Sequence, residues 1–369
     1  MCRLPKLRSA RLAAIWPGTP KAMEAIIHRL PASSPDDLSA FHAAVKWGAI
    51  RPECLVAVIG KTEGNGCVND FSRGLATMAW RQALGANAPA VALVMSGGTE
   101  GGMAPHWITV ETRSDERADG PGQGSPALAV GVGRTRNLQP HEIGMDVQID
   151  LVAAAVAEIK SKAKIDSVHF VQIKCPLLTS ERIHDSHMRG FETATTDTLK
   201  SMGLSRGAAA RGVAQALAEG AWSAVASTSA GVELMDHEIV VFGMSSQWTG
   251  GLMIDSAVMQ DAFDIEPVRA ALARLGLKSD GQLNQASRER VVALLAKAEA
   301  SPDGVIRGHR HTMLTDSDIS STRHARALVA GVLGGLIGHG AIYVSGGAEY
   351  QGPPGGGPVA IIASKESKQ

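Results

Sequence analysis

Short apolar runs, rich in valine and bounded by glycine or polar residues, recur along this chain in pairs. Runs of this length and composition favour β-strands. An alanine-rich stretch, typical of a helix, lies between the two runs of each pair. The pattern predicts an α/β protein, although the run near 291–299 also contains good helix formers and a helix stays an alternative there. The paired runs are 54–59 and 91–95, 168–173 and 223–228, 291–296 and 341–344.

The three pairs carry the same polar residues in the same order. The first run ends in lysine, an arginine opens the helical stretch, and the second run ends in serine. The distance from arginine to serine is 23, 23 and 22 positions. Such agreement indicates an internal repeat. The three sets are Lys61, Arg73 and Ser96, then Lys174, Arg206 and Ser229, and last Lys297, Arg323 and Ser345.

The repeat predicts how the chain is divided. We expect three homologous α/β repeats arranged around a pseudo-threefold axis, with the active site at the centre. The units are predicted at 24–113, 126–250 and 256–366, joined by linkers near 113–125 and 250–256, and residues 1–23 form a leader outside the fold.

Composition narrows the possible functions. The 36 basic and 36 acidic residues balance, which argues against nucleic acid or an anionic membrane as partner. No apolar run approaches the roughly 18 residues of a membrane span. The four cysteines have no metal-binding spacing, which favours a reduced, cytoplasmic protein.

The repeated residues suggest a chemistry. Serine needs a base to become a nucleophile, and a lysine can be that base only when burial or neighbouring positive charge keeps it neutral. Three arginines would supply such charge, and their planar donors suit the oxygens of a ring with threefold symmetry. We therefore predict Ser–Lys dyads around one small ligand.

One dyad differs from the other two in its neighbours. Lys61 and Lys297 are each followed two positions later by a glutamate, Glu63 and Glu299, which would face the same side of a strand and hold the lysine charged. Lys174 has no such neighbour. The sequence therefore predicts Lys174 as the neutral base and Ser229 as the nucleophile.

Long motifs around these residues resemble the cyanuric acid hydrolase/barbiturase family, over about residues 24–363. They are GKTEGNGCVND at 60–70, MSGGTEG at 95–101, HFVQIKCPLLT at 169–179, ASTSAGVEL at 226–234, KAEASPDG at 297–304 and VSGGAEYQGP at 344–353.

The resemblance implies a fold of three repeats and the hydrolytic opening of cyanuric acid to carboxybiuret, which loses carbon dioxide to give biuret. It places the nucleophile and base at Ser229 and Lys174. The alternatives are a barbiturase, which opens barbituric acid to ureidomalonate, and a binding protein without activity. The substrate contacts implied are Lys61, Arg73, Ser96, Gly97, Arg206, Ser229, Ala230, Lys297, Ser345 and Gly346, with either Arg323 or Arg326, one helical turn further on.

The resemblance also implies a structural Mg²⁺ or Ca²⁺, no catalytic cofactor and a homotetramer. Glu299 would be the carboxylate ligand, which gives it a role apart from Lys297 and weakens the comparison of dyads for the third unit. Oxygens of the following loop would complete the hard-cation shell. The loop ligands implied are Ala348, Gln351, Gly352, Pro353 and Gly356.

Overall fold

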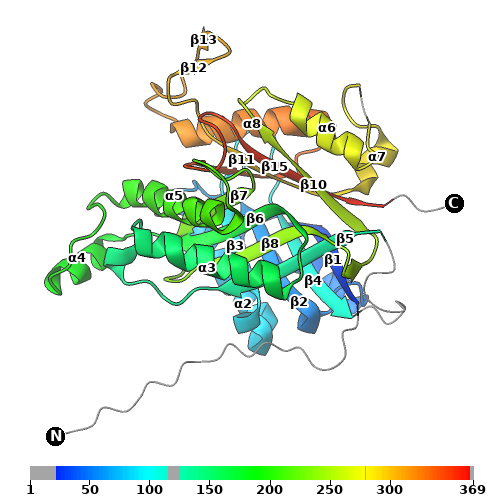
Figure 1. Ribbon diagram of the computed structural model, residues 1–369, viewed down its shortest axis with the longest axis horizontal. Coiled ribbons are helices and arrows are strands. Elements are labelled where there is room, and N and C mark those ends of the chain that lie inside the picture. The colour runs from blue at the N-terminus through cyan, green and yellow to red at the C-terminus, as the bar shows by residue number, and fades with distance from the viewer. Residues whose placement is uncertain (1–21, 115–124, 279, 366–369) are drawn as a thin grey trace, which may run out of the picture.

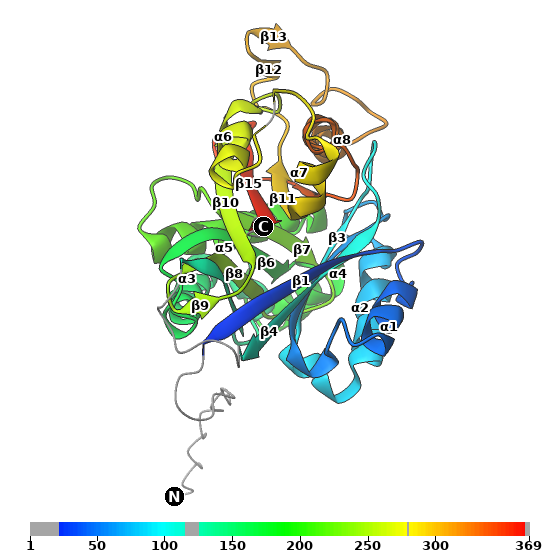
Figure 2. The ribbon, with the colours of Figure 1, turned by 90° about the vertical axis from the view of Figure 1, so that its right-hand side faces the viewer.

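The computed structural model describes residues 22–114, 125–278 and 280–365. Three main sheets lie at the centre, and helices cover their outer sides (Figure 1). After a 90° turn, α1 and α2, then α3, then α6, α7 and α8 are seen on different sides of the central strands (Figure 2). The α/β class is thus confirmed. Residues 1–21 of the expected leader and 115–124 of the first expected linker fall outside the described residues.

The first sheet is built from the part of the chain that begins at Met23. Its parallel pair, β2 and β3, is joined through a crossover that contains α2, as parallel strands require. Asp70 caps α2, since its side chain accepts a hydrogen bond from the Ser72 amide. The elements are β1 (Met23–Pro31), α1 (Ser39–Lys46), β2 (Leu55–Thr62), α2 (Phe71–Leu84), β3 (Ala92–Gly97) and β4 (His106–Ser114), with short 3₁₀ turns at Pro52–Cys54 and Gly85–Ala90.

The second sheet repeats this plan with longer helices. Helix α5 begins well before Arg206 because Asp197 caps it, accepting a hydrogen bond from the Lys200 amide. Arg206 therefore lies inside this helix and not at its start, where the sequence pattern had placed it. The elements are β5 (Ala127–Arg134), α3 (Asp146–Lys162), β6 (Ser167–Pro176), α4 (Ser180–Met188), α5 (Thr198–Leu217), β7 (Ala226–Gly231) and β8 (Glu238–Ser245), with a 3₁₀ turn at Pro140–Glu142.

The third sheet contains the segment whose structure the sequence left open. Residues 291–298 form a strand, because both its neighbours supply backbone partners. The elements are β10 (Leu252–Met259), α6 (Glu266–Arg274), α7 (Gln285–Arg290), β11 (Val291–Ala298), α8 (Ser321–Ile337), β14 (Tyr343–Gly346) and β15 (Gly357–Ser364), and a two-strand hairpin, β12 (Val305–Ile306) and β13 (His309–Arg310), projects from it.

The three sheets share one strand order. In each, the second strand pairs in parallel with the third and antiparallel with the fourth, and the fourth pairs antiparallel with the first. The orders are β3-β2-β4-β1, β7-β6-β8-β5 and β14-β11-β15-β10, and the short β9 (Trp248–Thr249) adds to the first sheet beside β1.

One expected linker is largely strand. Strand β10 begins at Leu252 and pairs along its length with β15, so most of the linker expected at 250–256 belongs to the third sheet. Turn-forming residues, Gly250 and Gly251, end the connection just before it. The composition of this segment was therefore a poor guide to where the sheet starts.

The sheets pack on one another through a shared core. Val94, Ile173 and Leu295, one from a parallel strand of each sheet, belong to the same cluster of buried side chains. This packing brings the ends of the three parallel pairs near the centre. No helix among the described residues has both the length and the apolar character needed to span a membrane. Within the same residues, Cys54, Cys67 and Cys175 are free thiols.

Candidate active site

The three lysines and three serines occupy equivalent places in the sheets. Each lysine lies on the second strand of its sheet, directly opposite the serine on the neighbouring parallel strand. The opposed pairs are Lys61 and Ser96, Lys174 and Ser229, and Lys297 and Ser345. The structure thus brings together each lysine and serine that the sequence paired.

All six side chains are buried, and burial favours the neutral form of the lysines. Burial disfavours the ammonium form and lowers the pKa of Lys61 and of Lys174, and it lowers the pKa of Lys297 to about 7. Arginines reinforce the shift: Arg326 acts on Lys61 and Arg206 on Lys297. The site can therefore hold neutral amines near neutral pH.

The serines of the first and third sheets meet at the centre. Their Oγ atoms, of Ser96 and Ser345, are 3.4 Å apart. Each also accepts a hydrogen bond from its own lysine, Lys61 at 3.4 Å and Lys297 at 3.3 Å. The Tyr343 hydroxyl lies near Ser96, Ser229 and Ser345 without a hydrogen bond to a described residue, and burial raises the pKa of Tyr343 to about 12, so the group stays protonated.

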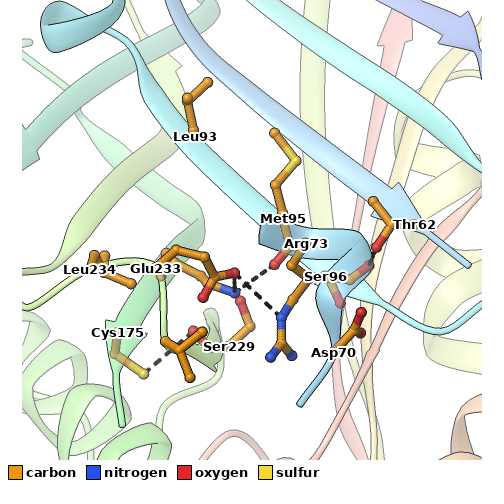
Figure 3. A network of polar contacts seen from close by, with 12 residues as sticks. Thr62, Asp70, Arg73, Leu93, Met95, Ser96, Cys175, Ser229, Glu233 and Leu234 are labelled. Carbon is orange, nitrogen blue, oxygen red and sulfur yellow. Dashed lines mark hydrogen bonds and ion pairs between the residues drawn. The ribbon is translucent and has the colours of Figure 1, made fainter. Parts of the chain in front are cut away.

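The second dyad is arranged differently. Lys174 donates a hydrogen bond to the carbonyl of Met95 at 2.7 Å, and its Nζ lies 3.3 Å from Glu233. The Ser229 Oγ is buried and has no hydrogen-bond partner among the described residues. Figure 3 shows the side chains of Ser229, Glu233 and Arg73 pointing toward one another, while the side chain of Met95 points away from them. A serine without a partner is free to turn toward a bound ring.

The arginines pair with glutamates from the neighbouring sheet. Arg206 donates to Glu349 at 2.8 and 2.6 Å, and Arg326 donates to Glu100 at 2.6 Å from two of its nitrogens. Arg73 Nε lies 3.4 Å from Glu233. Each pair joins two of the three sheets, so the site exists only when all three are assembled.

The structure separates the two arginines of α8. Arg326 is buried and makes the two-donor contact with Glu100, the counterpart of the contact that Arg206 makes with Glu349. Arg323 is partly exposed and reaches Glu100 through one nitrogen at 3.2 Å. The alignment of repeats had favoured Arg323. Arg326 occupies the equivalent place because it lies one turn deeper in the helix.

The glutamates are not placed beside the lysines as the sequence predicted. Glu63 follows the end of β2 and is exposed, so it does not face Lys61. Glu299 follows the end of β11, and its carboxylate accepts a hydrogen bond from the Gly355 amide at 3.3 Å. Lys174, expected to lack an acidic neighbour, is the lysine that pairs with a carboxylate, Glu233. The reason given for choosing the second dyad was therefore wrong.

The loop expected to bind a metal lies against Glu299. Burial raises the pKa of Glu299, and this effect outweighs the opposing charges of Lys297 and Arg206. The side chain of Gln351 is already engaged: its Oε1 accepts a hydrogen bond from the Thr228 amide at 2.6 Å, and its Nε2 donates to the Gly347 carbonyl at 3.2 Å. Among the described residues, no group of three or more His, Cys, Asp or Glu side chains is placed so that it could hold a metal ion.

Comparison with known proteins places this site in a family. A family model described as amidohydrolase ring-opening protein matches residues 26–364. The chain belongs to this ring-opening amidohydrolase family. A cyanuric acid amidohydrolase of Methylobacterium sp. (strain 4-46) is 55% identical over 92% of this chain and 96% of its own length, and one of Pseudomonas sp. (strain ADP) is 45% identical over 91% and 98%.

Solved structures agree with this membership. A cyanuric acid hydrolase matches with a TM-score of 0.88 and 44% identity, covering 93% of this chain and all of its own. The cyanuric acid hydrolase of A. caulinodans matches with a TM-score of 0.85 and 50% identity, covering 94% and 100%. As a ring-opening amidohydrolase, the chain is a hydrolase that acts on C–N bonds of cyclic amides.

The sequence did not single out the three glutamates of this amidohydrolase. Glu100, Glu233 and Glu349 each follow the serine of their unit by four positions, in Ser-Gly-Gly-Thr-Glu, Ser-Ala-Gly-Val-Glu and Ser-Gly-Gly-Ala-Glu. That regularity was the available signal. Their partners could not be read from it, because each arginine comes from a different sheet.

Proposed function

We propose that this enzyme opens the ring of cyanuric acid by hydrolysis, giving carboxybiuret and then biuret and carbon dioxide. The observation that carries the proposal is the identical register of three buried Lys–Ser pairs, which suits a ring with three equivalent carbonyl groups. The cyanuric acid amidohydrolases to which the chain is similar over more than nine tenths of its length support it.

We infer that the three sheets are homologous units related by a pseudo-threefold axis through the site. Their common strand order supports this arrangement. So does the cyclic pairing in which each unit supplies an arginine to the glutamate of the next. A ligand on the axis would meet similar donors from three directions, which the symmetry of cyanuric acid matches.

Lys174 and Ser229 are the proposed base and nucleophile. Neutral Lys174 takes the hydroxyl proton of Ser229, and Oγ attacks a ring carbonyl carbon. The C–N bond breaks as the ring nitrogen receives the proton from Lys174. Water then cleaves the acyl-enzyme ester, which restores the Ser229 hydroxyl and releases carboxybiuret.

The remaining dyads and arginines are proposed to grip the ring. Hydroxyls of Ser96 and Ser345 and the amines of Lys61 and Lys297 face the centre beside the backbone of their own strand ends, and such donors can stabilise developing negative charge on ring oxygens. The side chains and backbone groups proposed to contact substrate are Lys61, Arg73, Ser96, Gly97, Arg206, Ala230, Lys297, Arg326, Ser345 and Gly346.

Assaying two rings side by side tests the function. Purified enzyme should consume cyanuric acid and form biuret, and barbituric acid should be consumed far more slowly. Ser229→Ala and Lys174→Ala should each abolish turnover, and Ser229→Ala should also prevent the acyl adduct that intact-mass measurement detects on the wild type. Preferred loss of barbituric acid, or binding of either ring without turnover, would contradict the proposal.

We also propose a structural Mg²⁺ or Ca²⁺ beside Glu299. The raised pKa of this carboxylate and its contact with the Gly355 amide support the proposal, in which the carbonyls of Ala348, Gly352, Pro353 and Gly356 in the same loop would be further ligands of a hard cation that neutralises Glu299. Gln351 fits less well because its amide oxygen already serves Thr228.

Chelation tests the metal. A chelator should lower the melting temperature of the wild type, and added Mg²⁺ or Ca²⁺ should restore it. Glu299→Gln should melt at one temperature whether chelator is present or not. A wild type whose melting is unaffected by chelator, and which contains no divalent metal by elemental analysis, would rule the site out.

A further inference from the structure

The three Arg–Glu pairs at the centre are unequal. Arg206 and Arg326 each donate two hydrogen bonds of 2.6–2.8 Å to their glutamates. Arg73 makes no hydrogen bond to Glu233, and its NH2 group donates to the Cys67 carbonyl at 2.7 Å. A bidentate pair fixes a carboxylate in place, so Glu233 alone is left free to serve another group.

That other group is Lys174. One oxygen of Glu233, Oε1, lies 3.4 Å from Arg73 Nε and 3.3 Å from Lys174 Nζ (Figure 3 shows Glu233 joined to Arg73). Glu233 is almost wholly buried, and neither of its oxygens accepts a hydrogen bond from a described residue. It is a desolvated carboxylate held between a guanidinium and an amine.

The surroundings of the glycine two positions after each serine also differ between the second unit and the other two. A Cβ added at Gly98 would lie 2.1 Å from an Arg326 nitrogen, and one added at Gly347 would lie 2.5 Å from an Arg206 nitrogen. At Gly231 the nearest groups are the Glu233 carboxylate at 1.8 Å and the Lys174 stem at 2.7 Å. In the second unit, the place that a guanidinium fills elsewhere is filled by this carboxylate and lysine.

The backbone conformation of the second unit differs at the same position. Gly98 and Gly347 have φ of +99° and +78°, whereas Gly231 is not among the positive-φ glycines and ends strand β7. The turn after Ser229 is therefore built differently from the other two. The difference involves main chain and not only the rotamers of two side chains.

We propose that Glu233 is a positioning residue that acts through Lys174: its carboxylate draws the amine away from Ser229 in the free enzyme and decides at which pH that amine can accept the serine proton. This rests on the proposed role of Lys174 as base. It explains why Lys61 and Lys297 bind their own serines while Lys174 does not.

The charges that face Lys174 fix the direction of the effect. Burial lowers the pKa of Lys174, the Glu233 carboxylate opposes this, and Arg73 adds to the lowering, with the Cys175 thiol next to it on β6 and Asp70 at the start of α2 as further titratable groups. Removing the negative charge of Glu233 leaves burial and Arg73 unopposed. The amine then becomes neutral at lower pH.

The pH dependence of kcat/KM tests the proposal. In Glu233→Gln, the acid limb of the kcat/KM profile, where Lys174 becomes protonated, should shift to lower pH by about one to three units. This is the effect expected from losing an opposite charge at this distance. Glu233→Asp keeps the charge and should keep the limb of the wild type. Glu100→Gln and Glu349→Gln change the equivalent residues, which hold arginines, and should raise KM while the limb stays in place. Substrate ionisation is common to all five proteins and cancels in the comparison.

A second measurement does not depend on turnover. The side-chain NMR signal of Lys174, assigned through Lys174→Met, should titrate at lower pH in Glu233→Gln than in the wild type. An unchanged titration, or a limb that shifts equally in the three glutamine variants, would overturn the proposal. Failure of the wild type to open cyanuric acid would instead refute the proposed function, and the NMR titration would still test the link between Glu233 and Lys174.

Discussion

At the scale of single residues, the two arginines of α8 give a sharp comparison. The Arg326 side chain is 3% exposed and that of Arg323 is 37% exposed, although both contact Glu100. Arg326→Ala would leave a partly buried carboxylate without its main partner, at a cost of about 3 kcal/mol. Arg323→Ala removes an exposed contact worth under about 1 kcal/mol. Denaturant unfolding measures both, and equal losses would contradict the assignment.

The buried lysines predict how stability depends on pH. The pKa of Lys297 is about 7 in the folded chain and returns to about 10.5 on unfolding. Between these values the unfolded chain binds more protons than the folded one, so the free energy of unfolding rises with pH. The lowered pKa values of Lys61 and Lys174 act in the same direction.

Urea unfolding at pH 7 and at pH 9.5 checks this. The wild type should be more stable at the higher pH, and Lys297→Met should show a smaller increase because one contributing amine is gone. A matched exposed lysine variant, Lys46→Met, should keep the increase of the wild type. An increase that is the same in all three proteins would show that Lys297 is charged in the folded state.

At the scale of elements, the turns after the serines set how closely sheets approach. Two features require glycine at position 98. The φ of Gly98 is positive, and Arg326 occupies the place where a Cβ would lie. Gly98→Ala should cost at least about 1–2 kcal/mol from the backbone and should raise KM by displacing the guanidinium. Gly102→Ala, where a Cβ meets nothing, is the control and should match the wild type.

Elements also show what the sequence could predict. Lys61 and Ser96 were found because each lies next to the last residue of a strand, and parallel neighbours that end together place such residues opposite one another. This is local information, repeated three times. Glu63 was misjudged because the rule that i and i+2 share a face holds only inside a strand, and β2 ends at Thr62.

Contacts between units lay beyond the reach of the pattern. The partner of Arg73 is Glu233 from the turn after β7 in the second unit, and the partner of Arg206 is Glu349 from the third unit. Neither follows from spacing, because both depend on how complete sheets pack. The depth of Arg206 in α5 was also hidden: the Asp197 cap lies nine positions before Arg206, whereas the Asp70 cap of α2 lies three positions before Arg73.

At the scale of the whole molecule, repetition builds the site and unequal packing differentiates it. Three sheets of one strand order bring three dyads together, and carbonyls of one sheet accept hydrogen bonds from lysines of the next: Lys174 donates to Met95, and Lys297 donates to Thr228. At the site, the second unit is set apart from the others by the turn that carries Glu233. A single turn is thus enough to make one of three similar dyads distinct.

The outer surface predicts a contact between copies of the chain. On α2, the side chains of Phe71, Leu75 and Met78 are 84%, 45% and 68% exposed and lie on one face of the helix. Exposed apolar stripes of this kind mark interaction sites. We propose that this face is buried in a homotetramer.

Sedimentation equilibrium measures the assembly. The wild type should have about four times the 38.4 kDa of one chain, and the double variant Phe71→Asp, Met78→Asp should dissociate because charge would be buried in the contact. Trp47→Asp changes an equally exposed apolar residue at the end of α1 and should keep the mass of the wild type. A monomeric wild type would contradict the tetramer. A double variant that keeps its mass would place the contact on another face, since two buried carboxylates would not be tolerated on this one.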